Sequence, residues 1–121
     1  MAASAAIFDS GDYTPEVTQA IGTGPSTTAA LAASAAYTSS SYPSAGWGRI
    51  VGTVFADQAG TLLVEQSSDN ANWDTSSSFA VTASTGLGYS VEVVAPYWRL
   101  NYTNGATAQT TFRLYGWLRR I

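Results

Sequence analysis

Carboxylates are the only side chains in this sequence that could carry acid–base chemistry. Glu65 and Glu92 each lie within a run of strand-forming residues. Two carboxylates held about 5–9 Å apart can share the acid and base roles of a glycosidase. Isolated carboxylates on the polar face of a strand are ordinary, however, and 121 residues leave little room for a substrate cleft. The sequence therefore predicts a protein that is not an enzyme.

Most other catalytic and ligating side chains are absent from the sequence. It has no cysteine and no histidine, and its five basic residues are all arginine. The chain therefore cannot supply a disulfide, a thiolate or imidazole metal site, or a Ser-His-Asp or Cys-His nucleophile. The missing lysine excludes Schiff-base chemistry and a phosphate-loop lysine. We expect no catalytic residue and no cofactor.

One oxygen-rich segment, DNANWD at residues 69–74, could suggest a calcium site. An EF-hand loop needs glycine at its sixth position and glutamate at its twelfth, and neither fits here. Asp and Asn are also common turn residues, because their side chains bond to the local backbone. We therefore expect a plain turn and no bound metal.

The charge balance limits the partners. The formal net charge is −3 and the isoelectric point is about 4.5. Nucleic-acid binding needs a basic stripe, so none is expected. No apolar run approaches the length of a membrane span, so no membrane partner is expected. The start of the chain, MAAS, carries no positive charge and does not read as a secretory signal.

The composition divides the chain into an arm and a domain. Residues 1–34 are rich in Ala, Ser, Thr and Gly and contain too few large apolar residues to fold alone. They are either a disordered tail or an arm that orders on a partner. Thr14-Pro15-Glu16-Val17 would start a short helix that ends before Gly22. Residues 35–121 form the predicted domain.

The domain has the pattern of an antiparallel β-sandwich, jelly-roll-like in character, preceded by the extended N-terminal arm. Runs rich in β-branched and aromatic residues alternate with turn residues every 8–12 positions. The predicted strands cover residues 35–41, 49–56, 61–67, 78–83, 88–94, 97–103 and 109–117.

Two β-hairpins are predicted from the requirement that apolar side chains of paired strands share one face of the sheet. A four-residue loop at 57–60 would place Phe55 opposite Leu62 on one side of the sheet. The strands 97–103 and 109–117 would join through a loop of three or five residues with Gly105 at positive φ. Trp98 would then lie opposite or near Phe112, and Leu100 and Leu114 would share the core face.

The second register also predicts an outward face of aromatic and arginine side chains. It consists of Tyr97, Arg99, Arg113, Tyr115 and Trp117. These residue types are enriched at protein interfaces. The face could be an oligomer or partner interface, a second core face, or a platform on which a sugar stacks. Trp47 and Trp73 could likewise stack a sugar or plug an end of the sandwich.

Three stretches carry a resemblance: GRIVGTVFADQAGTL at 48–62, VEQSSDNANWD at 64–74 and YSVEVVAPYWRLNYTNGA at 89–106. They resemble small β-sandwich proteins encoded among the virion structural genes of tailed bacteriophages. The resemblance covers roughly residues 35–116 and rests on strand and turn residues. Where such proteins have a role, it is capsid decoration (cement), head fibre or tail structure, with no catalytic residues to carry over.

The resemblance and the composition together lead to one main hypothesis. The chain would be a capsid decoration protein on the virion surface, made in the host cytoplasm. Its arm would bind the major capsid protein, and the domain would form a homotrimer through a β face. The alternative is a tail or baseplate module that binds host surface glycans through exposed aromatic side chains.

Overall fold

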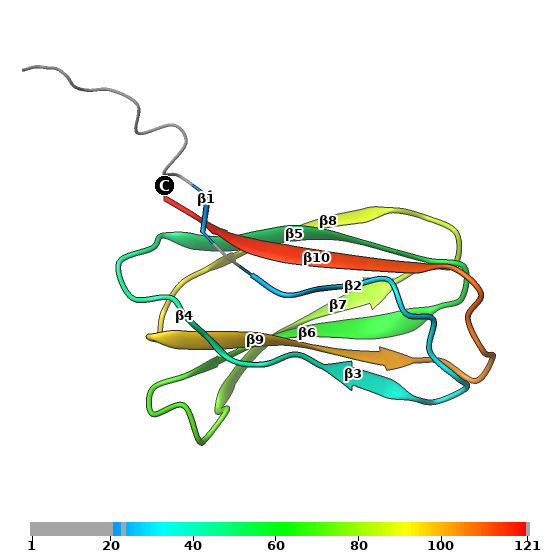
Figure 1. Ribbon diagram of the computed structural model, residues 1–121, viewed down its shortest axis with the longest axis horizontal. Coiled ribbons are helices and arrows are strands. Elements are labelled where there is room, and N and C mark those ends of the chain that lie inside the picture. The colour runs from blue at the N-terminus through cyan, green and yellow to red at the C-terminus, as the bar shows by residue number, and fades with distance from the viewer. Residues whose placement is uncertain (1–20, 23, 121) are drawn as a thin grey trace, which may run out of the picture.

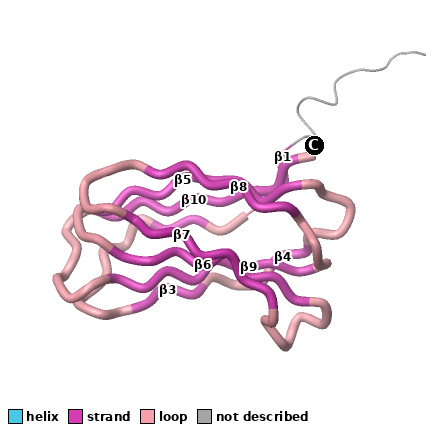
Figure 2. The backbone as a smooth tube through the Cα atoms, turned by 180° about the vertical axis from the view of Figure 1, so that it is seen from behind, coloured by secondary structure: helices cyan, strands magenta, loops and turns pink. Residues whose placement is uncertain are grey.

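The computed structural model describes residues 21–22 and 24–120 of the chain. In this part, two antiparallel sheets of five strands pack face to face, and no helix is present (Figures 1 and 2). The predicted all-β sandwich is therefore confirmed. The helix predicted to start at Thr14 lies outside the described residues.

We call the two layers sheet A and sheet B. Sheet A, uppermost in Figure 1, has the order β1-β10-β5-β8, with β2 also pairing with β10. Sheet B has the order β3-β9-β6-β7, with β4 also pairing with β9. The strands of sheet A are β1 (Ile21–Gly22), β2 (Ser26–Thr27), β5 (Arg49–Ala56), β8 (Leu87–Glu92) and β10 (Phe112–Arg119). Those of sheet B are β3 (Ala36–Thr38), β4 (Tyr42–Pro43), β6 (Gly60–Ser67), β7 (Thr75–Val81) and β9 (Tyr97–Asn104).

Each of the seven predicted strands overlaps one of these strands, but both predicted hairpins are wrong. Strands β5 and β6 lie in different sheets, and so do β9 and β10. Leu62 points into the core while Phe55 points out of sheet A. Gly105 is not at positive φ, and Gly46 is the one such glycine among the described residues. Turn residues mark where a strand ends, but they do not say whether the chain pairs back or crosses to the other layer.

The core lies between the sheets and is rich in aromatic residues. Its largest fully buried side chains are Trp98 and Tyr102 from sheet B and Phe112 from sheet A. Phe112 packs on Tyr102, with ring centroids 4.8 Å apart, instead of lying opposite Trp98. Leu100 and Leu114 are both fully buried, as their predicted shared core position requires.

The phenol of Tyr89 crosses a gap left by two glycines in sheet A. Gly52 on β5 pairs with Gly116 on β10, and Tyr89 on β8 is the other neighbour of Gly52. A Cβ atom would lie 2.4 Å from the Tyr89 hydroxyl at Gly52 and 2.8 Å from it at Gly116. The two glycines are therefore required by packing.

Gln66 holds the link by which the chain crosses from sheet A to sheet B. Its side chain, 2% exposed, points inward from β6. Its Nε2 donates to the carbonyl oxygen of Glu92, and its Oε1 accepts from the amides of Val94 and Ala95. A buried amide thus satisfies backbone groups that would otherwise be unpaired at the end of β8.

Residues 24–34 of the predicted arm lie against the sandwich. The amide of Gly116 donates to the carbonyl oxygen of buried Pro25, and a Cβ on Gly24 would lie 2.0 Å from the carbonyl oxygen of Gly116. Further along, Leu31 packs on the core and exchanges two hydrogen bonds with Gln109. This part of the arm therefore covers the core and the edge of β10. The first 20 residues of the arm lie outside the described residues.

Candidate binding face

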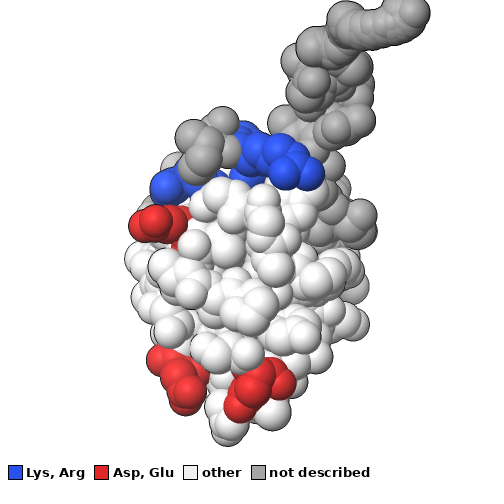
Figure 3. Space-filling model, turned by 90° about the vertical axis from the view of Figure 1, so that its left-hand side faces the viewer, with Lys and Arg blue, Asp and Glu red and all other residues white. Residues whose placement is uncertain are grey.

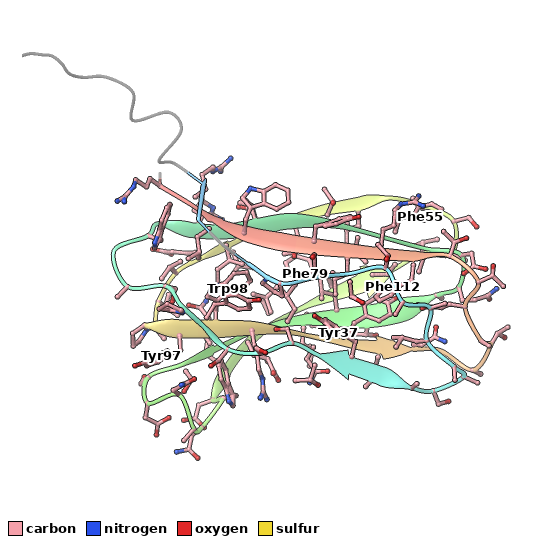
Figure 4. The ribbon with its side chains drawn as sticks, viewed as in Figure 1. Tyr37, Phe55, Phe79, Tyr97, Trp98 and Phe112 are labelled. Atoms are coloured by element: carbon pink, nitrogen blue, oxygen red, sulfur yellow. The ribbon has the colours of Figure 1, made fainter. Side chains whose placement is uncertain are left out.

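The predicted face of Tyr97, Arg99, Arg113, Tyr115 and Trp117 does not exist as one surface. Its members come from β9 and β10, which lie in different sheets. Tyr97 and Arg99 project from the outer side of sheet B, and the other three project from the outer side of sheet A. In Figure 4, Tyr97 lies on the sheet B side of the molecule, whereas Phe55, the cross-strand partner of Arg113, lies on the sheet A side. The prediction of one continuous face was wrong because it depended on the β9–β10 hairpin.

The arginine on sheet B is engaged within the chain. Nε of Arg99 lies 2.6 Å from Oε1 of Glu65 on the neighbouring strand, and its guanidinium carbon lies 4.3 Å from the centroid of the Trp73 ring. Glu65 is itself 9% exposed. Arg99 therefore ties the link between β6 and β7 to the sheet, which leaves little of it for a partner.

The oxygen-rich segment at 69–74 forms a local turn. Oδ1 of Asp69 accepts hydrogen bonds from the Ser67 hydroxyl and from the amides of Ala71 and Asn72, and its Oδ2 accepts from the Asn72 side chain. These bonds, led by those from Asn72, lower the pKa of Asp69. Its carboxylate is thus used to shape the turn that presents Trp73.

The two strand carboxylates considered for acid–base chemistry are not brought together. Glu65 belongs to sheet B and is paired with Arg99. Glu92 belongs to sheet A, where it lies opposite Arg49. Within the described residues, no group of three or more His, Cys, Asp or Glu side chains is placed to hold a metal ion.

The outer side of sheet A carries a trough. The three long strands of sheet A lie in the order β10-β5-β8. The side chains that point outward are large on β10, smaller on β5 and smallest on β8. In one row Tyr115, Thr53 and Gly88 lie side by side, and in the next row Trp117, Val51 and Ser90 do so. Large rings on β10 thus form a wall, while glycine and serine on β8 leave the other side open. We call this surface the sheet A trough.

Charged side chains close the two ends of the trough. At one end Arg113 lies opposite Phe55, with its guanidinium carbon 4.6 Å from the centroid of that ring. At the other end Arg49 lies between Arg119 and Glu92. Nε of Arg49 donates to the Ser90 hydroxyl at 2.6 Å, which fixes the guanidinium beside the floor of the trough.

Two hollows occupy the trough. One, of about 250 Å³, is lined by side chains that include Phe55, Leu87, Arg113 and Tyr115. The other, of about 400 Å³, is lined by residues that include Val51, Ser90, Trp117 and Arg119. Gly88 borders both hollows. A side chain at Gly88 would enter open space, since a Cβ there meets only one atom, at 4.0 Å.

Arginine gathers at one end of sheet A. Figure 3 looks onto the end of the sandwich where β10 ends, with basic side chains along the sheet A side and most acidic side chains on the opposite side. Arg49 and Arg119 are direct cross-strand partners there. Like charges in that arrangement are unfavourable to stability. In the described part of the chain, no carboxylate forms an ion pair with Arg113 or Arg119.

The prediction from sequence found part of this surface and missed the rest. Arg113, Tyr115 and Trp117 do share a face, but Phe55, Gly88, Ser90, Arg49 and Arg119 were not assigned to it. Outward residues of 49–55 alternate with the buried Ile50, Gly52 and Val54, and that period of two was visible in the sequence. The pairing of β5 with both β10 and β8 was not visible. Trp47, the other predicted stacking residue, packs on the core and lies under Arg120.

Comparison with known proteins gives three findings. Residues 14–118 match the family described as the uncharacterised protein YqxG N-terminal domain. The uncharacterised protein YqxG of Bacillus subtilis (strain 168) is 38% identical over 69 residues, which are 55% of this chain and 23% of that protein. The crystal structure of the PBSX exported protein XepA matches with a TM-score of 0.74 at 30% identity, covering 81% of this chain and 38% of that chain.

This chain therefore spans well under half of each relative. The similarity to XepA covers most of this chain, so it supports the fold directly.

The described residues contain no helix that is long and apolar enough to cross a membrane.

Proposed function

We propose that this chain, which belongs to the family of the YqxG N-terminal domain, is a structural protein of a phage virion. The likeness to the exported PBSX protein XepA supports this proposal, as does the resemblance of the strand and turn residues to virion proteins of tailed phages. The finer role that we propose is capsid decoration, with the chain on the outer surface of the head.

The observation that carries this role is the anchoring of the N-terminal segment. Ile21 pairs with Arg119, so the segment joins the domain at the end of β10. Gly24 and Pro25 then fix it to the backbone of Gly116. Residues 1–20 precede this firm attachment and carry three acidic and no basic residues. We propose that they are the arm that binds the major capsid protein, while the sandwich stays outside the shell.

The test is a shortened chain that lacks residues 1–20 and starts at residue 21. Removal of residues 1–34 would also remove Pro25 and Leu31 from the domain, so loss of binding would be ambiguous. Removal of residues 1–20 leaves these contacts in place. Heads of the encoding phage, purified from a mutant that lacks this protein, should co-sediment with the full chain and not with the truncated one. Decoration by the truncated chain would overturn the proposed role of the arm.

We also propose that the protein is a homotrimer and has no enzymatic activity. Three-fold positions of a capsid would favour a trimer, and light scattering on the isolated chain measures its mass. The ion pair of Glu65 with Arg99 supports a structural use of this carboxylate. Glu65→Gln should accordingly leave head binding unchanged.

A further inference from the structure

We propose that the sheet A trough binds an acidic saccharide, a chain of sugar rings that carries carboxylate or phosphate groups. This inference is independent of the proposed capsid decoration, because it concerns the face of the sandwich and not the arm. It starts from the shape of the surface. Small-molecule sites are concave, and this face contains two adjoining hollows.

The length of the trough suits several linked sugar rings. From Arg113 to Arg119 the wall spans six residue-to-residue steps of β10, which is about 20 Å at the rise of a β-strand. The wall between these arginines is made by Tyr115, 37% exposed, and by partly exposed Trp117. Aromatic rings that show one face to solvent offer an apolar surface to the C–H side of a sugar ring.

The polar groups of the trough point to an anion on the saccharide. Arg113 and Arg119 stand at opposite ends, and neither forms an ion pair within the described residues. A guanidinium forms its strongest hydrogen bonds in paired contacts with carboxylate or phosphate. Arg49 is oriented by Ser90 beside the same hollow as Arg119. Glu92 is the one acidic residue among the outward cross-strand partners that form the trough. It lies beyond Arg49 in the row that begins with Arg119, at the edge of the sheet.

Two other classes of ligand fit less well. A peptide added as a strand binds at a sheet edge, which on this side of sheet A is the outer edge of β8, whereas the floor of the trough is β5, whose backbone is paired on both sides. A nucleic acid needs many phosphate contacts, and the chain has a net charge of −3 and only five arginines. A saccharide is recognised by side chains across a shallow surface, which is what the trough provides.

The test is calorimetric titration of the full chain with a matched pair of ligands. The first is a tetramer of galacturonic acid, and the second is the same tetramer with each carboxylate methyl-esterified. The acidic tetramer should bind, and the ester should bind about tenfold more weakly because it lacks the charge-assisted hydrogen bonds. Equal binding of the two, or binding of neither, would overturn the proposal.

Three variants locate the site. Trp117→Ala should weaken binding of the acidic tetramer about tenfold, and Arg119→Gln should do so without affecting the ester. Gly88→Leu should fill the trough from the side of β8 and abolish binding. Ala80→Leu is its matched control, because Ala80 is exposed on the outer side of sheet B. Unchanged affinity in Gly88→Leu, with the fold intact by circular dichroism, would also refute the site.

A third probe separates ring recognition from simple charge attraction. A glycerol-phosphate tetramer carries anions but no sugar ring, so it should bind more weakly than the acidic tetramer and be unaffected by Trp117→Ala. Binding as tight as that of the galacturonate tetramer would mean that the arginines alone recognise the ligand, and the proposal would then be wrong.

Discussion

The hydroxyl of Tyr89 on β8 donates a hydrogen bond of 2.7 Å to the carbonyl oxygen of Tyr115 on β10, across the intervening strand β5. The ring can span β5 because Gly52 and Gly116 have no side chains there. The phenol is largely buried, and this burial raises its pKa. The Tyr89 side chain therefore connects β8, on the open side of the trough, to β10, which forms its wall, on the core side of sheet A.

Gly52→Ala should destabilise the protein by about 1–3 kcal/mol, the usual cost of overpacking a core. The added Cβ would lie 2.1 Å from the carbonyl oxygen of Tyr115 as well as against the phenol of Tyr89. Urea denaturation measures the free energy of unfolding. Gly86→Ala is the matched control, because nothing lies within 4 Å of its Cβ. Equal stability of the two variants would show that sheet A adjusts freely at this point.

Tyr89→Phe tests the hydrogen bond apart from the packing. The ring is retained and the bond to Tyr115 is lost, so the free energy of unfolding should fall by about 1 kcal/mol. Because the bond ends on a residue of the trough wall, the same variant should also weaken binding of the galacturonate tetramer. A change in stability with unaltered binding would mean that the wall does not depend on this support.

Gln66→Leu should lower the free energy of unfolding by about 1–3 kcal/mol. The substitution retains a buried side chain but leaves the carbonyl oxygen at the end of β8 and two amides of the β8–β9 link without their partner. Amide hydrogen exchange at Val94 and Ala95 should become faster than in the native chain. Gln58→Leu, in the turn after β5, serves as the control and should leave these two amides protected.

The link between β9 and β10 should weaken in acid. Oxygens of Asp57 accept hydrogen bonds from the Thr110 hydroxyl and from the amides of Thr110 and Thr111. These bonds lower the pKa of Asp57 from 3.8 to about 2. Since the folded state has the lower pKa, the stabilisation is complete above about pH 4 and is lost as the pH falls toward 2.

The measurement is the melting temperature between pH 6 and pH 2. Asp57→Asn should melt lower than the native chain at pH 6 and should lose less of its melting temperature on acidification. Asp74→Asn removes an exposed acid in the β6–β7 link and should follow the native curve. A native curve that is parallel to that of Asp57→Asn would contradict the assignment.

The strands could be predicted from sequence because their signal is local. Runs of β-branched and aromatic residues between turn residues located β5, β6 and β9 to within a residue at each end, whereas β7 and β10 begin three residues from their predicted starts. Pairing could not be predicted in the same way. The segment DQAG at 57–60 is as suitable for a corner between sheets as for a hairpin, and only contacts far along the chain decide between them.

The candidate site was half predicted for the same reason. Arg113, Tyr115 and Trp117 alternate within one strand, so their common direction follows from its period of two. Their neighbours Phe55 and Gly88 come from strands whose pairing the sequence does not display. Arg99 was assigned to this surface through the predicted pairing of β9 with β10, but its environment is set by Glu65 and by a turn that brings Trp73 over it.

Gly24→Ala should detach the N-terminal segment from β10, because a Cβ there would lie 2.0 Å from a backbone oxygen that cannot move aside. Limited proteolysis should then cut between residues 21 and 30 while residues 35–120 remain resistant. Gly86→Ala should keep the native cleavage pattern. Protection of the segment in the Gly24 variant would show that β1 and β2 hold it without close packing at Gly24.

The position of β10 has a consequence during synthesis. It is the last of the described strands in chain order, yet it lies inside sheet A, between β5 and the short strands β1 and β2. A nascent chain that still holds β10 within the ribosome has a gap where this strand belongs, and its N-terminal segment has nothing to pair with. Sheet A should therefore close only after the whole sandwich has emerged, so that chains stalled before residue 112 expose the core and become substrates for chaperones and proteases.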